Sequence, residues 1–426
     1  MKLSCLIDFN PKRPLEKGAI ASFIEMADLL EGERDVSGIG NRIFNGGGSK
    51  FKNGDTLFAR ITPCLENGKT AKVSGLPSNA VCLGSTEFIV MAAKDPSIDE
   101  AFVYYVARYP DFRAYAKGRM EGTSGRQRVS WQAIADYEIP DFSSLERSGI
   151  GGVLSSIDNL ISNNRRVNQA LEVMARTLFK AWFVDFEPVR AKLEGRWQRG
   201  QSLPGLPAHL YEIFPDRLVE SELGEVPEGW GMRSLDSIAN YLNGLALQKF
   251  PPESDDEFLP VIKIAQLRAG NTKGADRASA RIKPEYVVVD GDILFSWSGS
   301  LEVEVWNGGR GALNQHLFKV TSDTVPKWFY FFATRHHLQR FRAIAADKAT
   351  TMGHIQRKHL TDARIAIASP EGMKIFDIAI APLFDQLVSN AQQSRSLAQM
   401  RDSLLPRLIS GELRVPDAER IVGAAI

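Results

Sequence analysis

Cysteine is scarce in this chain, and its few cysteines cannot form a disulfide framework. The 426 residues contain only Cys5, Cys64 and Cys82, all in the first half and without a CxxC pair. Such usage favours a reducing compartment. No apolar run approaches the roughly 20 residues that span a bilayer, and the first residues lack the apolar core of a signal peptide. The sequence therefore predicts a cytoplasmic protein.

Motifs of known enzymes are also missing. The six histidines form no HExxH motif and have no cysteine at ligand spacing, which argues against a metal site. There is no Gly-x-Ser-x-Gly elbow and no GxGxxG. The run closest to the Asn/Asp-Pro-Pro-aromatic motif of nucleobase methyltransferases, residues 250–253, lacks both ends of that motif. Residues 46–50, Gly-Gly-Gly-Ser-Lys, lack the P-loop order and are interpreted as a turn.

An excess of one charge is likewise absent. The chain has 52 basic and 51 acidic residues, a formal net charge of +1. An acidic partner would therefore have to be bound by local patches, because no global field attracts it. The length is sufficient for two or three domains with cores of their own.

Two long helical patterns stand out against this ordinary background. Apolar positions in residues 153–183 step by three and four, which is typical of a coiled-coil seam, and residues 380–408 repeat the pattern. The predicted seam residues are Ile157, Leu160, Asn164, Leu171 and Leu178 in the first helix and Phe384, Leu387, Ala391, Ala398 and Leu405 in the second. Asn164 is either a tolerated polar position or a device that fixes the register. Because its counterpart is Ala391, it can pair only with non-equivalent atoms.

The two helical stretches belong to a tandem duplication. Residues 157–163 (IDNLISN) align with 384–390 (FDQLVSN), a shift of 384 − 157 = 227. Inside the preceding segments the shift is larger, because Gly54-Asp55 aligns with Gly291-Asp292 at 291 − 54 = 237. The variation therefore lies in loops within each copy. The first copy looks short at its front, since nothing before Leu3 corresponds to residues 228–240.

The repeat predicts an α+β protein with two mixed domains. Its segments are a first domain at 1–150, a helix at 151–186, a Pro- and Gly-rich connector at 187–229, a second domain at 230–375, a second helix at 376–415 and a tail at 416–426. Long stretches without regular structure are uncommon inside one domain, so the connector is interpreted as a linker that clamps against, or passes between, two domains. A short closing strand is expected at residues 136–140, just before the first helix.

Polar and basic loops recur at the same place in both copies. The candidate DNA-binding residues are Arg60, Lys69, Arg119, Arg126, Gln127 and Arg128 in the first domain and Lys348, Thr350, Thr351, His354, Arg357 and Lys358 in the second. Such side chains suit base edges and phosphates. The alternative is a solvated surface, because charged residues are mostly exposed. Recurrence just before the closing strand of each copy favours binding.

The chain resembles the specificity (S) subunit of type I restriction-modification systems. The resemblance covers nearly the whole chain, and three stretches carry it. They are IDNLISNNRR at 157–166 continuing into AWFVDFEPV at 181–189, SELGEVPEGW at 221–230 and LLPRLISGEL at 404–413.

This resemblance implies two target-recognition domains separated by a pair of long antiparallel coiled-coil helices. Each domain would bind one half of a split double-stranded DNA target. The helices would set the spacing and dock two modification subunits. Those subunits would hold S-adenosylmethionine and methylate adenine, and restriction subunits would add ATP- and Mg-dependent translocation and cleavage. This chain would hold no cofactor or metal and would catalyse nothing. About 30 residues at 1.5 Å per residue make a spacer of roughly 45 Å, compared with about 34–36 Å for one turn of DNA.

Two other functions remain open from the residues alone. The duplicated domains could be a scaffold that binds other proteins around a central helix pair. The chain could also be a lone methyltransferase or nuclease, which would be active without partners.

Overall fold

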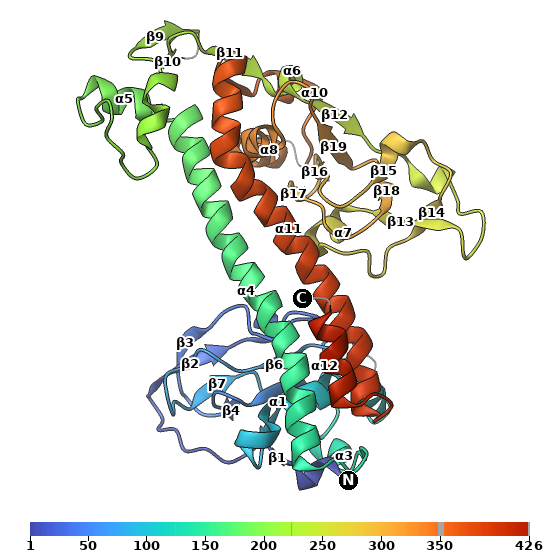
Figure 1. Ribbon diagram of the computed structural model, residues 1–426. Coiled ribbons are helices and arrows are strands. Elements are labelled where there is room, and N and C mark those ends of the chain that lie inside the picture. Colours follow the sequence, from blue (N-terminus) through green and yellow to red (C-terminus); the bar gives the residue numbers. More distant parts are fainter. Residues whose placement is uncertain (124, 223, 348–352, 425–426) are drawn as a thin grey trace. The chain divides into compact units, whose positions relative to one another are not determined.

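The computed structural model describes residues 1–123, 125–222, 224–347 and 353–424 (Figure 1). The chain divides into two compact units. Unit 1 comprises Met1–Asn163 and Ser396–Ile426, and unit 2 comprises Asn164–Arg395. Two helices of 40 residues, α4 (Ser144–Phe183) and α11 (Pro370–Ile409), contribute to both units. Among the described residues, no helix has the length and apolar character that crossing a membrane requires.

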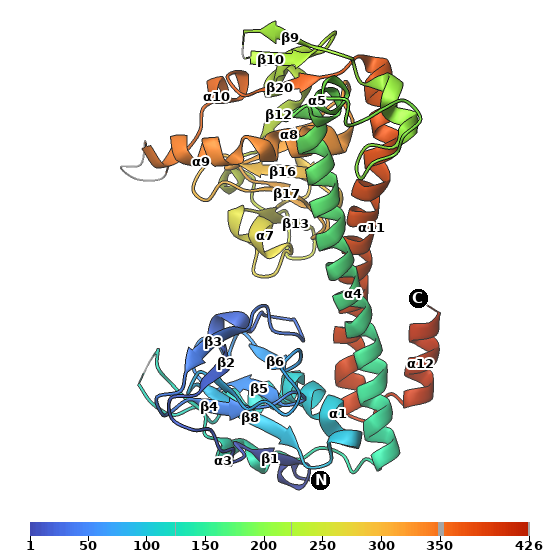
Figure 2. The ribbon, with the colours of Figure 1, turned by 90° about the vertical axis from the view of Figure 1, so that its left-hand side faces the viewer.

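Unit 1 contains two four-stranded sheets packed beside helices (Figure 2). The first sheet has the order β1 (Ile7–Phe9), β8 (Phe88–Ala93), β5 (Thr56–Ala59), β6 (Thr70–Lys72), and the second β3 (Gly40–Ile43), β2 (Ile20–Ile24), β7 (Cys82–Gly84), β4 (Ser49–Phe51). The helical elements are η1 (Leu3–Cys5), η2 (Met26–Asp28), α1 (Pro96–Arg108), α2 (Pro110–Lys117), α3 (Trp131–Ala135) and α12 (Val415–Gly423). Because α1 buries residues 102–107 completely, it links the first sheet to the long helices.

Unit 2 repeats this architecture. Its sheets have the orders β12 (Asn240–Asn243), β19 (Leu317–Thr321), β16 (Ile293–Ser296), β17 (Val303–Val305) and β14 (Arg277–Ser279), β13 (Phe258–Ile262), β18 (Gly311–Leu313), β15 (Val287–Val288). A third sheet pairs β11 (Gly231–Ser234) with β20 (Arg364–Ile367). The helical elements are α6 (Leu235–Ile238), η4 (Leu247–Lys249), α7 (Ile264–Ala269), η5 (Pro284–Tyr286), α8 (Lys327–His336), α9 (Leu338–Asp347) and α10 (Arg357–Thr361).

The strand orders confirm the duplication element by element. β1-β8-β5-β6 corresponds to β12-β19-β16-β17, and β3-β2-β7-β4 corresponds to β14-β13-β18-β15. Gly54 and Gly291, which precede the equivalent strands β5 and β16, have φ angles of 89° and 87°. This left-handed conformation favours glycine. The pairs Phe58↔Ile89 and Phe295↔Phe318 then give shifts of 295 − 58 = 237 and 318 − 89 = 229.

The front of the first domain differs from the expectation. The amide of Leu3 donates to the carbonyl of Tyr137 at 3.0 Å, as the amide of Leu235 donates to that of Ala363 at 2.9 Å. Residues 3–8 therefore take the place of 235–240, for which the sequence suggested no counterpart. The two segments share little beyond buried apolar side chains at the same positions, so alignment by identity missed them.

The strand expected at residues 136–140 is reduced to a single bridge between Glu138 and Lys2. A hydrogen bond from the amide of Ile139 to the carbonyl of Met1, at 3.0 Å, extends it. The expectation of a regular strand was wrong because the segment pairs only with residues 1–3. The equivalent segment in unit 2 does form a strand, β20, paired over four residues with β11.

The long helices pack against each other within each unit, where Figure 1 shows them side by side. In unit 1, Ile157 of α4 and Leu405 of α11 share one buried cluster. In unit 2, Asn164 donates to Gln393 Oε1 at 2.8 Å and the side chain of Asn168 donates to the carbonyl of Leu387 at 2.9 Å. Because the partner number falls as the α4 number rises, the pair is antiparallel.

The buried face of α4 differs from the predicted seam. Ile157, Asn164, Phe384 and Leu405 are buried, whereas the other predicted seam residues, Leu160, Leu171, Leu178, Leu387, Ala391 and Ala398, are only half-buried. Ile161 and Phe179, each one residue after a predicted seam position, are buried instead, and so is Ala175, one helical turn after Leu171. A third element explains this difference. Phe179 also packs against Phe329 and Phe332 of α8, with ring centroids 5.6 and 5.8 Å apart, so α4 faces more than one partner.

The connector is an integral part of unit 2. Its regular elements are α5 (Glu187–Leu193), η3 (Ala208–Ile213), β9 (Leu218–Ser221) and β10 (Gly224–Pro227). Trp197, Leu210 and Phe214 lie in the main core of the unit. The indole of Trp182 on α4 donates to the carbonyl of Gly205 at 3.2 Å. The connector is therefore packed against α4 and the core of unit 2, which corresponds to the alternative of a linker that clamps against a domain.

Candidate nucleic-acid interface

Three of the predicted residues of the first domain converge where β5 ends. Arg60 follows β5, and its carbonyl accepts from the amide of Val129 at 2.9 Å. The amide of Thr62 donates to the carbonyl of Gln127 at 3.1 Å, and the backbones of Arg128 and Ile61 form an isolated antiparallel β-bridge. These bonds hold the segment after β5 against the Arg-rich loop before α3, so Arg60, Gln127 and Arg128 lie together.

The guanidinium of Arg128 is held by a carboxylate within the domain. Its Nε lies 2.9 Å from Glu87 Oε2 and its Nη2 lies 2.8 Å from Glu87 Oε1, which is a bidentate pair. The hydrogen bond from Glu87 and then its charge raise the pKa of Arg128. The charges of the pair cancel, so Arg128 and Glu87 together would offer hydrogen-bond donors and acceptors in a fixed geometry instead of a free positive charge.

The other predicted residues of this domain are placed differently. Arg126 is exposed, and Arg119 stacks its guanidinium 3.3 Å from the centroid of the Tyr115 ring. Lys69 donates its ammonium to the carbonyl of Met26 at 3.0 Å, where it holds η2. Lys69 lies beside the end of β5, because its carbonyl accepts from the amide of Ala59 at 3.1 Å, but its ammonium is engaged by the Met26 carbonyl.

Unit 2 has different side chains at the equivalent scaffold positions. Trp297 follows β16 as Arg60 follows β5, and its carbonyl accepts from the amide of Ile355 at 3.0 Å. His354 forms an isolated antiparallel β-bridge with Ser298, as Arg128 does with Ile61. The amide of His316 donates to Asn314 Oδ1 at 3.2 Å, which matches the bond from the Glu87 amide to Ser85 Oγ at 3.2 Å. Arg60, Glu87 and Arg128 thus correspond to Trp297, His316 and His354.

The three residues of unit 2 form an aromatic cluster. The ring centroid of Trp297 lies 5.9 Å from that of His316 and 6.2 Å from that of His354. The indole N–H donates to Asn243 Oδ1 at 2.9 Å, and Ser298 Oγ lies 3.0 Å from His316 Nδ1. Aromatic faces, imidazole nitrogens and a hydroxyl can stack on or hydrogen-bond to nucleobases.

Sequence reasoning identified His354 but not Trp297 or His316. Their signals were the shifts of the neighbouring strands, 297 − 60 = 237 for Trp297 and 316 − 87 = 229 for His316. Arg357 is exposed and donates back to the carbonyl of Tyr241 at 3.2 Å, and Lys358 is exposed. The predicted residues Lys348, Thr350 and Thr351 lie outside the described residues.

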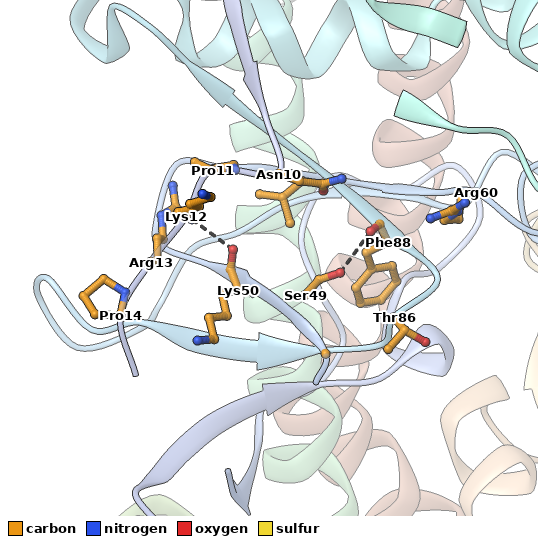
Figure 3. Close-up of a pocket in the computed structure, with 12 residues that line it drawn as sticks. Asn10, Pro11, Lys12, Arg13, Pro14, Ser49, Lys50, Arg60, Thr86 and Phe88 are labelled. Carbon is orange, nitrogen blue, oxygen red and sulfur yellow. Dashed lines mark hydrogen bonds between the residues drawn. The ribbon is translucent and has the colours of Figure 1, made fainter. Parts of the chain in front are cut away.

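Two adjacent grooves open on the first domain beside Arg60. One, of 760 Å³, is drawn in Figure 3. The other has a volume of 510 Å³ and shares Gly48 and Thr86 with the first. The turn of residues 46–48 borders the second groove, and its three glycines have φ angles of 104°, 79° and 82°. Such angles require glycine, which agrees with a turn between β3 and β4. Within the described parts of the chain, no group of three or more His, Cys, Asp or Glu residues is placed to hold a metal ion.

Comparisons with known proteins agree with this architecture. Residues 227–390 match the family described as the type I restriction modification DNA specificity domain. The specificity subunit of the type I restriction enzyme HindI from Haemophilus influenzae is 25% identical over 410 residues, covering 85% of this chain and 87% of the relative. That of MjaIX from Methanocaldococcus jannaschii is 25% identical over 332 residues, covering 76% and 71%.

A solved structure shows the same fold. The type I restriction-modification S subunit from M. genitalium superposes with a TM-score of 0.53 at 15% identity, covering 96% of this chain and 95% of that one. The duplicated α+β domains with paired helices are thus the fold of an S subunit. Residues 227–390 thus match the type I restriction modification DNA specificity domain, and the chain as a whole is similar in sequence and in fold to type I specificity subunits.

Proposed function

We propose that this chain is the DNA sequence-recognition subunit of a type I restriction-modification complex, with each domain reading one half of a split target. One observation carries this proposal. The same scaffold position holds Arg60, with the Arg128–Glu87 pair beside it, in one copy and the Trp297 cluster in the other. Because readout depends on which donors, acceptors and apolar groups face the bases, two copies with different chemistry at one position suit two different half-sites.

The long helices would dock the modification subunits. In unit 2 they expose apolar side chains that no described contact covers, with Met174 exposed by 52% and Ile378 by 75%. Exposed apolar residues grouped on a surface are typical of protein interfaces. The modification subunits would hold S-adenosylmethionine and methylate adenine. Restriction subunits would use ATP and Mg, and this chain would supply binding and spacing only.

The experiment begins with the target. Mapping methylated adenines in DNA from cells that carry the system gives the two half-sites. Gel shifts of the complex with its modification partners would then use duplexes that carry both half-sites, one half-site or scrambled sequence, at one salt concentration. We expect binding to the full target to be about 10³-fold or more tighter than to scrambled DNA. Equal affinity for all duplexes at matched salt would contradict sequence recognition, and absence of DNA binding would favour the protein scaffold.

A further inference from the structure

The larger groove of the first domain is lined by cations. It runs between residues 10–14, 48–50 and 86–90 and ends at Arg60. Four basic residues line it, Lys12, Arg13, Lys50 and Arg60, and its described lining contains no carboxylate. Arg13 is paired with Asp55, with Nη2 and Oδ1 2.8 Å apart. Three positive charges therefore remain for a ligand.

These charges occupy both ends of the groove. Figure 3 shows Lys12 and Arg13 at one end and Arg60 at the other, with Asn10 and Ser49 between them. The two middle residues serve the fold, because Asn10 Oδ1 accepts from the amide of Val90 at 2.8 Å and Ser49 Oγ donates to the carbonyl of Phe88 at 2.9 Å. A single small anion could reach only one end. A ligand with successive negative charges matches both ends.

Arg60 supplies an independent indication of a ligand. Its Nε is buried and has no hydrogen-bond partner among the described residues. Buried N–H groups are almost always paired, so such a donor at a groove wall indicates an acceptor that binds there. The guanidinium lies in the lining of the groove itself.

The glycine turn leaves one wall open for a close approach. Around Gly46 and Gly47 a Cβ would meet no atom within 4 Å, and at Gly48 it would lie 2.9 Å from the carbonyl oxygen of Gly84. Gly48 therefore lines the groove of the cations as bare backbone, while Gly46 and Gly47 border the adjacent groove. The turn lacks the helix of a P-loop, so it is not a nucleotide-binding loop of that kind.

We propose that this groove binds the phosphodiester backbone of DNA, a role that rests on the proposed function and names its phosphate contact in the first domain. Two of these cations have no basic counterpart among the described residues of the second domain. The pairs Lys50↔Leu83 and Val287↔Ala312 make Val287 the counterpart of Lys50, and Trp297 is the counterpart of Arg60. The first domain therefore holds DNA more through charge, and the second more through aromatic and imidazole groups.

The test measures the salt dependence of DNA binding. The full chain in complex with its modification partners would be titrated into a fluorescent duplex carrying the mapped target and into a random duplex, between roughly 50 and 200 mM salt. The double variant Lys12→Gln/Lys50→Gln removes two phosphate contacts and leaves Arg60, which the proposed function places in base readout, unchanged. We expect the slope of log K against log salt to fall by about 1–2, with both duplexes weakened by the same factor. Lys12→Arg with Lys50→Arg keeps both charges and should restore the slope.

The matched control is Lys17→Gln, since Lys17 is exposed on the same β1–β2 connection but does not line the groove. It should leave the slope unchanged. An unchanged slope in the double variant, or a loss confined to the target duplex, would overturn the phosphate site while sequence recognition stands. If the unaltered complex binds neither duplex, the proposed function fails together with this inference.

Discussion

Replacing Arg401 by methionine should destabilise unit 1 strongly. Arg401 on α11 and Asp158 on α4 are each 3% exposed, and Nη1 and Oδ1 are 2.6 Å apart. Among the residues that the structure describes, the second carboxylate oxygen accepts only from the Tyr105 hydroxyl, at 2.7 Å. Removing the guanidinium leaves a buried carboxylate with one donor, and breaking a buried pair in this way costs about 3–5 kcal/mol. The methionine matches Met174, which occupies the equivalent position of α4, since 401 − 227 = 174.

Removing both charges should be far milder. Asp158→Leu with Arg401→Met replaces the ion pair by apolar side chains, and such replacements are often neutral or stabilising by about 1–4 kcal/mol. The double variant should therefore be more stable than Arg401→Met alone. This reversal distinguishes an unpaired buried charge from simple loss of packing volume, because a packing defect would only grow with the second substitution.

Hydrogen exchange followed by mass spectrometry gives the local readout. Peptides from residues 150–163 should exchange roughly 10²- to nearly 10⁴-fold faster in Arg401→Met, which is the factor that about 3–5 kcal/mol implies. Peptides from residues 240–320, in unit 2, serve as an internal reference. Arg407→Met is the control on the same helix, because its pair with Glu412 is exposed by 43% and 66% and should contribute less than about 1 kcal/mol. Equal effects of the two single variants would refute the reasoning.

Three further predictions concern unit 2. Burial, and then His336, lower the pKa of His337 to about 4, so the folded state favours its neutral form; stability should fall by up to roughly 3 kcal/mol as pH drops from about 6.5 to about 4. Urea titrations of His337→Gln should show less of this loss, and an identical pH profile would contradict the assignment. Asn390→Ala leaves the Oδ1 of Asn168 without its donor at 2.9 Å, and urea unfolding should show a loss of about 1–3 kcal/mol. Trp297→Ala should relax one half-site of the methylation map while the other persists; a change in both would place Trp297 outside base readout.

Much of the fold could be predicted from the sequence because each pattern that indicates an element occurs twice, once in each copy. Gly54 and Gly291 marked equivalent strands through a shared conformational need, and the repeated heptad-like spacing predicted both long helices. The predicted seam was displaced because a period of three and four residues assumes a single partner. In unit 2, α4 faces α11, α8 and the connector, so Phe179 is buried although it lies off the predicted stripe.

The candidate site was harder to predict because charge does not reveal pairing. Lys69 and Arg128 look alike in sequence, yet one binds a backbone carbonyl and the other a carboxylate 41 positions away. Lys12 was not predicted because it lies 48 positions before Arg60 in a loop without a recognised motif, and only the fold brings it to the same groove as Arg60. Trp297 was not chosen because a tryptophan is more often a core or rim residue than a platform for base stacking, and the sequence alone did not show that it occupies the position of Arg60.

The polar contacts between the long helices are asymmetric although the helices are copies. At a shift of 227, Asp158 corresponds to Asp385 and Arg401 to Met174, so only one of the two equivalent positions has the buried ion pair. Pairing of α4 with a second α4 in the same register would place Asp158 opposite Met174 and bury a carboxylate without a cation. Such burial costs several kcal/mol. The contact of Asn168 with Asn390 disfavours pairing of α11 with a second α11, since the counterpart of Asn168 is Arg395, whereas the counterpart of Asn390 is Asn163. Buried polar groups can fix partner and register at some loss of stability, and here they favour pairing of the two different copies over pairing of like copies.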